Sequence, residues 1–142
     1  SLRAITNLND LGEIQIKVDC DVIQADGGTR TASITGGFVA LHLACQNLMN
    51  LGVLKKIPLR GQIAAISCGI YENMPVLDLD YLEDSNAQAD SNFVLTENHD
   101  VAEIQGTAEQ GPFSEAYFID MLGLAKKGVS ELILIQKAAL EL

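Results

Sequence analysis

The sequence predicts an α+β fold, a two-layer arrangement in which helices pack against mixed sheets, and three observations support this. Residues 13–23 alternate between apolar and polar side chains, which is the period of a half-buried strand. Residues 34–48 carry apolar side chains at spacings of three and four, the stripe of an amphipathic helix. Residues 62–70 form a mostly apolar run, typical of a strand covered on both faces.

The length and composition predict one modest domain with an aliphatic core. The chain has 142 residues, of which 48% are hydrophobic, with four Phe, three Tyr and no Trp. No apolar run approaches the length of a membrane span and no signal peptide opens the chain, so we expect a cytoplasmic protein. Cys20, Cys45 and Cys68 are odd in number and lack C-x-x-C spacing, which predicts buried thiols and neither a disulfide frame nor a zinc site.

The net charge of −10 argues against indiscriminate binding of nucleic acid. Lys55, Lys56 and Arg60 are the densest of only nine basic residues. If RNA is the substrate, it must be held by a few local contacts, by another part of the protein or by a neighbouring subunit. The two lysines either touch RNA or, as is more usual, solvate a connector.

The elements follow in order along the first half of the chain. A strand is expected over residues 13–23 and a helix over residues 29–50, ended by Asn50-Leu51-Gly52. A connector at 54–58 leads to the apolar strand at 62–70. Residues 71–73 then form a hairpin turn, and residues 74–80 form the returning strand.

The second half is expected to hold two strands and two helices. The strands cover residues 92–96 and 101–107. A helix starts at the N-cap Ser114 and is stopped by Gly128, and a final helix runs from Ser130. His42 lies beside the helix stripe, where a satisfied packing histidine is expected, and His99 lies in a turn and should be exposed.

The turn between the first strand and the long helix, Asp26-Gly27-Gly28-Thr29-Arg30, has the composition of an anion site. Glycines let the backbone approach a ligand closely, and the start of a helix offers unpaired amide groups and the positive end of its dipole. The hydroxyl and guanidinium that follow suit an oxyanion, above all phosphate. This turn lacks the Gly-Lys-Ser/Thr of a P-loop. The alternative is a plain loop in which Asp26 or Thr29 only caps the helix.

Residues 78–90 hold five acids in thirteen residues. A run of carboxylates is usually a solvated face. These acids, however, are interleaved with apolar residues and lie between strand segments, so we expect some of them to face a partly enclosed space. Clustered carboxylates there would raise one another's pKa or bind a hard cation, and both outcomes suit phosphoryl chemistry. Ser67 and Cys68 have no obvious base nearby, so nucleophilic catalysis is not expected.

Residues 21–36, DVIQADGGTRTASITG, resemble the signature of the bacterial ribonuclease PH family, phosphorolytic 3′ exoribonucleases related to polynucleotide phosphorylase. The resemblance implies that Gly28, Thr29 and Arg30 bind phosphate. It also implies that Asp84 and Asp90 are the catalytic pair, which either binds Mg²⁺ or protonates the leaving 3′ oxygen. Asp78 and Asp80 match the family as supporting residues, and residues 103–109 match a strand that backs the site.

The same resemblance implies a function for the full-length protein. It would remove 3′-terminal nucleotides from tRNA precursors and other RNA, including ribosomal RNA, as nucleoside diphosphates. Inorganic phosphate would be the co-substrate and Mg²⁺ the cofactor, in a homo-oligomer built as a hexameric ring of dimers. Residues 1–54 would end a first exoribonuclease subdomain and residues 55–142 would form the second.

An earlier part of the fold, with a further phosphate-binding arginine, would be missing, so the chain alone should be inactive. Two alternatives stay open: an inactive fragment or ring subunit with a structural role in RNA processing, and a non-enzymatic phosphate-binding module.

Overall fold

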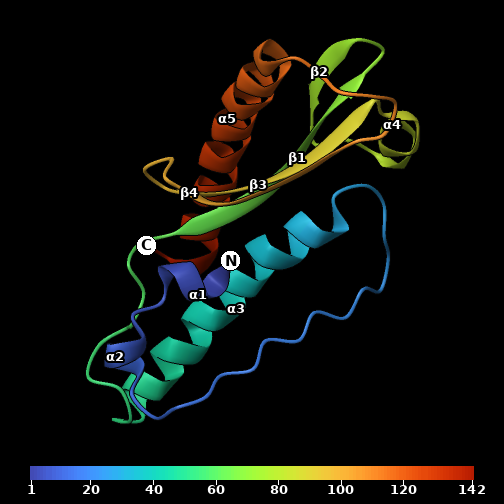
Figure 1. The fold of residues 1–142 in the computed structure, drawn as a ribbon. Coiled ribbons are helices and arrows are strands. Elements are labelled where there is room, and N and C mark those ends of the chain that lie inside the picture. Colours follow the sequence, from blue (N-terminus) through green and yellow to red (C-terminus); the bar gives the residue numbers. More distant parts are fainter.

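A computed structural model describes all 142 residues and places a four-stranded sheet between two long helices (Figure 1). The elements are α1 (Leu2–Ile5), α2 (Leu8–Leu11), α3 (Thr29–Asn50), β1 (Ile63–Tyr71), β2 (Met74–Leu77), α4 (Tyr81–Asn86), β3 (Ala89–Thr96), β4 (Val101–Ala108) and α5 (Glu115–Leu140). The strand order is β2-β1-β3-β4, and every neighbouring pair is antiparallel. The α+β class is confirmed, but the sheet is antiparallel throughout and not mixed.

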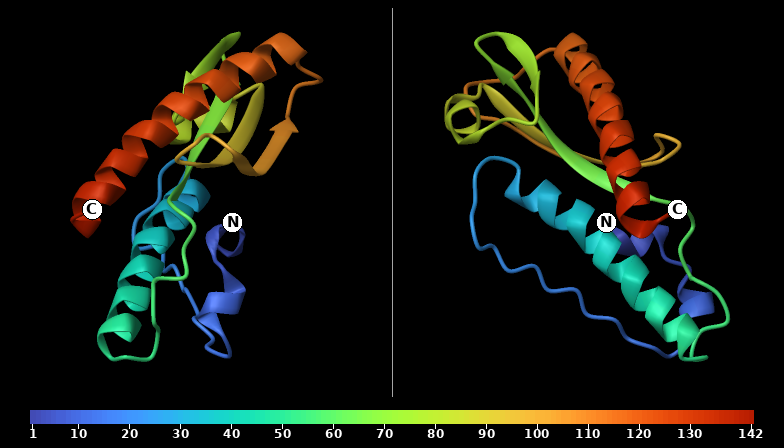
Figure 2. Two further views of the ribbon diagram at one scale, coloured as in Figure 1. Left: turned by 90° about the vertical axis from the view of Figure 1, so that its left-hand side faces the viewer. Right: turned by 180° about the vertical axis from the view of Figure 1, so that it is seen from behind.

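The central strand β1 is buried on both faces, as its apolar run predicted. The face toward α5 contributes the larger core cluster, which includes Ile66, Cys68, Phe93 and Met121. The opposite face packs Ile63, Ala65 and Val94 against Phe38 of α3. Figure 2 shows α5 along one side of the sheet and α3 beneath the other. The sheet is therefore the middle layer, and each face has its own helix.

The hairpin between β1 and β2 is tight, as predicted. Tyr71 pairs with Met74, and the two residues between them, Glu72 and Asn73, have φ angles of 49° and 62°. Left-handed conformations at both central positions give a turn whose twist matches that of the flanking strands. The turn fixes the register in which β2 pairs with β1.

The strand predicted over residues 13–23 is wrong: the segment is extended but pairs with no strand of this chain. Its apolar side chains instead line a groove of about 390 Å³ along α3, which includes Ile14, Ile16, Val18, Leu41 and Cys45. Cys20 at the end of this segment is exposed, whereas Cys45 and Cys68 are buried as expected. The alternating pattern therefore predicted correctly which side chains face the protein, but the segment has no strand partner.

Helix α5 is one continuous helix, so the predicted stop at Gly128 is wrong. Ser114 does cap it, accepting a hydrogen bond from the Tyr117 amide at 3.3 Å. A Cβ at Gly128 would lie 2.5 Å from Ile66 Cδ1 and 3.1 Å from Leu77 Cδ1. The glycine lets α5 approach the sheet closely, which is why it occurs inside a helix that it would otherwise weaken.

Buried polar groups join the layers near the end of α5. The Gln136 amide donates to the Thr35 carbonyl oxygen at 2.9 Å and to the Ile63 carbonyl oxygen at 3.0 Å. His42 is buried beside Phe38, as expected of a packing histidine, but its Nδ1 has no hydrogen-bond partner. Burial lowers the pKa of His42. His99 is exposed, as predicted, and its Nε2 lies 2.9 Å from Ser130 Oγ.

The acidic stretch contains a helix that was not predicted. Helix α4 is capped by Asp80, whose side chain accepts from the Glu83 amide, while the Glu83 side chain accepts from the Asp80 amide. This reciprocal capping box ends β2 at Leu77 and delays the next strand until Ala89. Asp84 therefore lies on a short helix and not between strand segments. None of the helices of this chain is both long and apolar enough to span a membrane.

Candidate phosphate and carboxylate site

Helix α3 begins with open amide groups. Gly28 is its N-cap, in the left-handed conformation at φ 68°, and no side chain caps the helix. The Thr29 hydroxyl donates to the Asp26 carbonyl oxygen at 3.1 Å, and the Asp26 carboxylate accepts from the amide of Tyr81. The reading in which Asp26 or Thr29 caps α3 is therefore wrong. The first-turn amides remain available to an anion at the positive end of a 22-residue helix.

Three side-chain oxygens surround Gly28. A Cβ at this position would lie 3.2 Å from Thr31 Oγ1, 3.3 Å from Ser67 Oγ and 3.7 Å from Asp78 Oδ1. Ser67 belongs to a strand in which most side chains are apolar. Its hydroxyl is buried and has no hydrogen-bond partner. The loop is thus packed against polar atoms of the sheet and of the segment after β2.

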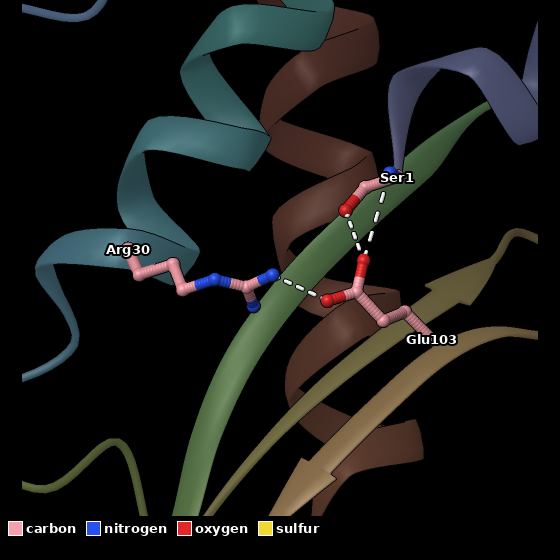
Figure 3. A network of polar contacts seen from close by, with 3 residues as sticks. All are labelled: Ser1, Arg30 and Glu103. Carbon is pink, nitrogen blue, oxygen red and sulfur yellow. Dashed lines mark hydrogen bonds and ion pairs between the residues drawn. The ribbon is translucent and has the colours of Figure 1, made fainter.

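Arg30 projects from the first turn of α3 toward β4 (Figure 3). One of its Nη atoms contacts Glu103 Oε1, and the other Glu103 oxygen accepts from the Ser1 hydroxyl at 2.6 Å. The hydrogen bonds from Ser1 and Arg30 lower the pKa of Glu103 to about 2, so it is a carboxylate at neutral pH. The Arg30 side chain is 45% exposed, and the ion pair uses only one of its nitrogens. Donors of the guanidinium therefore remain for a phosphate.

The sheet face toward α3 changes from apolar to polar near the start of that helix. Ile63 and Ala65 belong to the core cluster on this face. Because side chains alternate along a strand, Ser67 and Gly69 of β1 lie on the same face. The register places two polar rows across the strands there: Ser67, Asn92 and Gln105, followed by Gly69, Asp90 and Thr107. The loop of residues 26–30, called the phosphate loop here for its predicted role, therefore lies at the polar end of the sheet.

Asp90 and Asp84 reach the site from different elements, β3 and α4. Burial raises the pKa of Asp90, and the nearby charges of Asp84 and Glu109 raise it further. The structure thus brings together the two aspartates singled out in the sequence, with Asp84 on an exposed helix. Their catalytic roles, like the phosphate-binding role of Gly28, Thr29 and Arg30, stay predictions.

The carboxylate pair fits a magnesium ion in its donor chemistry. Mg²⁺ prefers oxygen ligands, and it is commonly held by one or two carboxylates together with waters and substrate phosphates. No group of three or more His, Cys, Asp or Glu in the chain is arranged to hold a metal. Asp84 and Asp90 would therefore supply two ligands at most, and a cation would relieve the repulsion that raises the pKa of Asp90.

Other candidates lie outside the site or are inert. Burial, together with the charge of Asp78, raises the pKa of Cys68 to about 12, so it holds no thiolate nucleophile. Lys55 and Lys56 follow the far end of α3, about 30 Å from its start at 1.5 Å per residue. Lys56 pairs with Asp10 at 2.9 Å.

The sequence analysis missed the partners of the site residues. The family resemblance assigned Glu103 and Glu109 to a strand that backs the site, but not the contact of Glu103 with Arg30. Ser67 is brought to the loop by the packing of β1, which no local pattern reveals. For Asp26 only the alternative of a local cap was considered, yet its partner lies 55 residues away. One signal was available: Asp80-Tyr-Leu-Glu83 has the spacing of a capping box and could have predicted α4.

Comparisons with known proteins concern the sequence and the fold. Residues 61–128 match domain 2 of the 3′ exoribonuclease family. Over 99% of its length the chain is 59% identical to ribonuclease PH of Caulobacter vibrioides and 58% identical to that of Rhodospirillum rubrum. It spans only 59% and 58% of the length of those two relatives.

The fold has a solved counterpart. The crystal structure of rice (Oryza sativa) Rrp46 superposes with a TM-score of 0.64 at 19% identity, covering 84% of this chain and 51% of that one. At that identity the likeness concerns the fold alone. The matches in sequence extend over nearly the whole chain, so it is similar throughout to the ribonuclease PH family of 3′ exoribonucleases.

Proposed function

We propose that the full-length protein containing this chain is a phosphate-dependent 3′-to-5′ exoribonuclease. One observation carries the proposal: the open start of α3, with Arg30, lies at the same polar end of the sheet as Asp84 and Asp90. An anion site beside paired carboxylates is what phosphorolysis of a phosphodiester requires. A phosphate-binding module alone would leave the carboxylate pair without a role.

The reaction would run as an in-line displacement at phosphorus. The first-turn amides of α3 and the Arg30 guanidinium would hold inorganic phosphate with one oxygen facing the terminal phosphodiester. That oxygen forms a bond to phosphorus while the bond to the 3′ oxygen of the preceding nucleotide breaks. The products are a nucleoside diphosphate and an RNA shortened by one nucleotide. Arg30 would offset the negative charge that gathers in the transition state.

The carboxylate pair has two alternative roles. Its raised pKa allows Asp90 to hold a proton at higher pH than an ordinary aspartate, and this proton could pass to the leaving 3′ oxygen. Otherwise Asp84 and Asp90 would hold Mg²⁺, which when bound supplies positive charge to the phosphates. Either role places both aspartates beside the reacting phosphorus.

The proposal extends to the setting in which the protein acts. The substrates would be the 3′ ends of tRNA precursors and other RNA, in the cytoplasm. The net charge of −10 favours an assembly in which further surfaces hold the RNA, such as a homo-oligomeric ring of dimers. Residues 1–54 would close a first exoribonuclease subdomain. The second, from residue 55, would contain the match to domain 2 that begins at residue 61.

One assay tests the proposal. The purified full-length protein is incubated with a short RNA bearing a free 3′ hydroxyl and Mg²⁺, with and without inorganic phosphate, and the released nucleotides are separated by chromatography. We expect nucleoside diphosphates only when phosphate is present. Nucleoside monophosphates without phosphate would indicate hydrolysis instead. Intact RNA in both samples would indicate a structural role.

A further inference from the structure

We propose that Asp26 is a positioning residue that ties the phosphate loop to helix α4. The Tyr81 amide donates a hydrogen bond to Asp26 Oδ1 at 2.7 Å. Tyr81 is the first residue of α4, and Asp26 lies two residues before the N-cap of α3. One side chain of the loop therefore accepts a hydrogen bond from the first residue of the helix that bears Asp84. The inference deepens the proposed function, because the tie would matter for catalysis at that site.

The backbone packs the same two segments together. A Cβ at Gly27 would overlap the Leu79 carbonyl oxygen and would lie 2.9 Å from the Asp80 carbonyl carbon. Only glycine allows the loop to approach the start of α4 this closely. The Thr29 hydroxyl closes the turn from the other side by donating to the Asp26 carbonyl oxygen. The side chain of Asp26 is thereby directed to α4 and away from the start of α3.

Helix α4 depends on such contacts because little else holds it. It has six residues and none of them is buried, so no core packing fixes it. A helix this short is marginal in water on its own. The Asp80 and Glu83 capping box satisfies two amides, and Asp26 satisfies that of Tyr81. The bond from Asp26 is the one that comes from the phosphate loop.

The consequence for the site is geometric. Asp84 lies within α4, and its charge reaches Asp90 on β3. The bond from Asp26 therefore sets where one carboxylate lies relative to a phosphate on α3. Losing the bond should leave phosphate binding by Thr29 and Arg30 in place and misplace Asp84. Turnover should fall while the Michaelis constant for phosphate changes little.

The test compares Asp26→Ala, Asp26→Asn and the control Asp21→Ala in the full-length protein. Asp21 is an exposed acid of the same segment without a hydrogen bond of its own in this structure. We expect Asp26→Ala to lower kcat by about tenfold or more, the effect of losing a hydrogen bond to a charged group. Its KM for phosphate should stay within about twofold, since the open amides remain. Asp26→Asn keeps an acceptor oxygen and should restore most of kcat, and Asp21→Ala should behave as wild type.

Hydrogen exchange of the peptide spanning residues 79–86 gives a second measurement that does not need activity. Exchange there should quicken in Asp26→Ala and not in Asp26→Asn. Unchanged exchange in Asp26→Ala would overturn the tie, as would an Asn variant as impaired as Ala, or a rise in the phosphate KM with kcat intact. If wild type releases no nucleoside diphosphate, the proposed function fails and hydrogen exchange alone decides the role of Asp26.

Discussion

Arg30 is shared between a helix start and an edge strand, and this sharing defines its chemistry. Glu103 of β4 contacts the guanidinium at one end, while the backbone of Arg30 is fixed in the first turn of α3. An arginine held in this way loses less conformational entropy when it binds an anion than a free one would. Its contact with Glu103 also partly neutralises it, so phosphate binding must rely on the open amides as well.

The first prediction concerns this side chain. In the full-length protein, Arg30→Ala should raise the KM for phosphate by about tenfold or more, because a charge-assisted contact is worth roughly 1.5–3 kcal/mol. Binding of RNA should change far less. Steady-state kinetics with varied phosphate, together with RNA binding by fluorescence anisotropy, measure the two effects. Arg60→Ala removes an exposed arginine elsewhere and is the control. An unchanged KM and kcat in Arg30→Ala would refute the phosphate role.

The second prediction concerns the carboxylates. Asp84→Asn and Asp90→Asn should each lower kcat by on the order of 10²-fold or more, since each removes a proton donor or a charge that holds a cation. Folding, followed by circular dichroism, should stay intact because Asp84 is exposed on α4 and Asp90 is only partly buried on β3. Asp120→Asn, on the exposed side of α5, is the matched control. Near-normal activity in both variants would return the acidic stretch to a solvated surface.

At the scale of elements, the sequence was informative wherever a local pattern and tertiary packing agree. The stripe at residues 34–48 predicted α3 with its observed bounds, and the apolar run predicted β1. The alternation at residues 13–23 gave the buried face but not the pairing, because a strand needs a neighbour that local sequence does not specify. Gly128 was predicted to end a helix because the sequence does not show its close contact with Ile66.

The site followed the same division. Gly28, Thr29 and Arg30 are contiguous and could be singled out together, whereas Asp84 and Asp90 needed the family resemblance. Glu103 and Ser67 join the site through register, and Asp26 through a contact between distant segments. Such partners depend on the assembled fold, so propensity and spacing could not indicate them.

The third prediction tests the contact between α5 and the sheet. Gly128→Ala should destabilise the protein by about 1–3 kcal/mol, because the new methyl group would meet Ile66 and Leu77 in a packed core. Gly123→Ala in the same helix has nothing within 4 Å of the new Cβ and should be stabilising by up to about 1 kcal/mol. Urea unfolding of both variants measures the difference. Equal effects would mean that propensity alone governs both positions.

At the scale of the whole molecule, the sheet lies between its two long helices, whereas the extended segment before α3 has no strand beside it. Residues 13–22 run alongside α3 without strand partners, and the groove beside them is lined mainly by apolar side chains. Unpaired backbone in an extended segment invites pairing with another chain. The relatives are longer than this chain, which makes further sequence one natural source of cover.

The fourth prediction follows from that surface. The 142-residue chain purified alone should show little or no phosphorolysis beside the full-length protein. A net charge of −10 repels RNA unless other surfaces hold it, and the unpaired segment should cause self-association. Nucleotide release and analytical ultracentrifugation measure the two effects. Rates comparable to those of the full-length protein would show that these residues suffice for the reaction.

The close approach of Gly27 to the Leu79 carbonyl oxygen has a genetic consequence. Every other amino acid carries a Cβ, so any missense change of this codon forces two backbone segments apart. In a saturation library selected for activity, codon 27 should tolerate only synonymous changes. Codon 36 encodes a glycine at which an added Cβ would meet nothing within 4 Å, so it should accept alanine freely. A selection of this kind would record the contact between loop and helix as a pattern of surviving alleles.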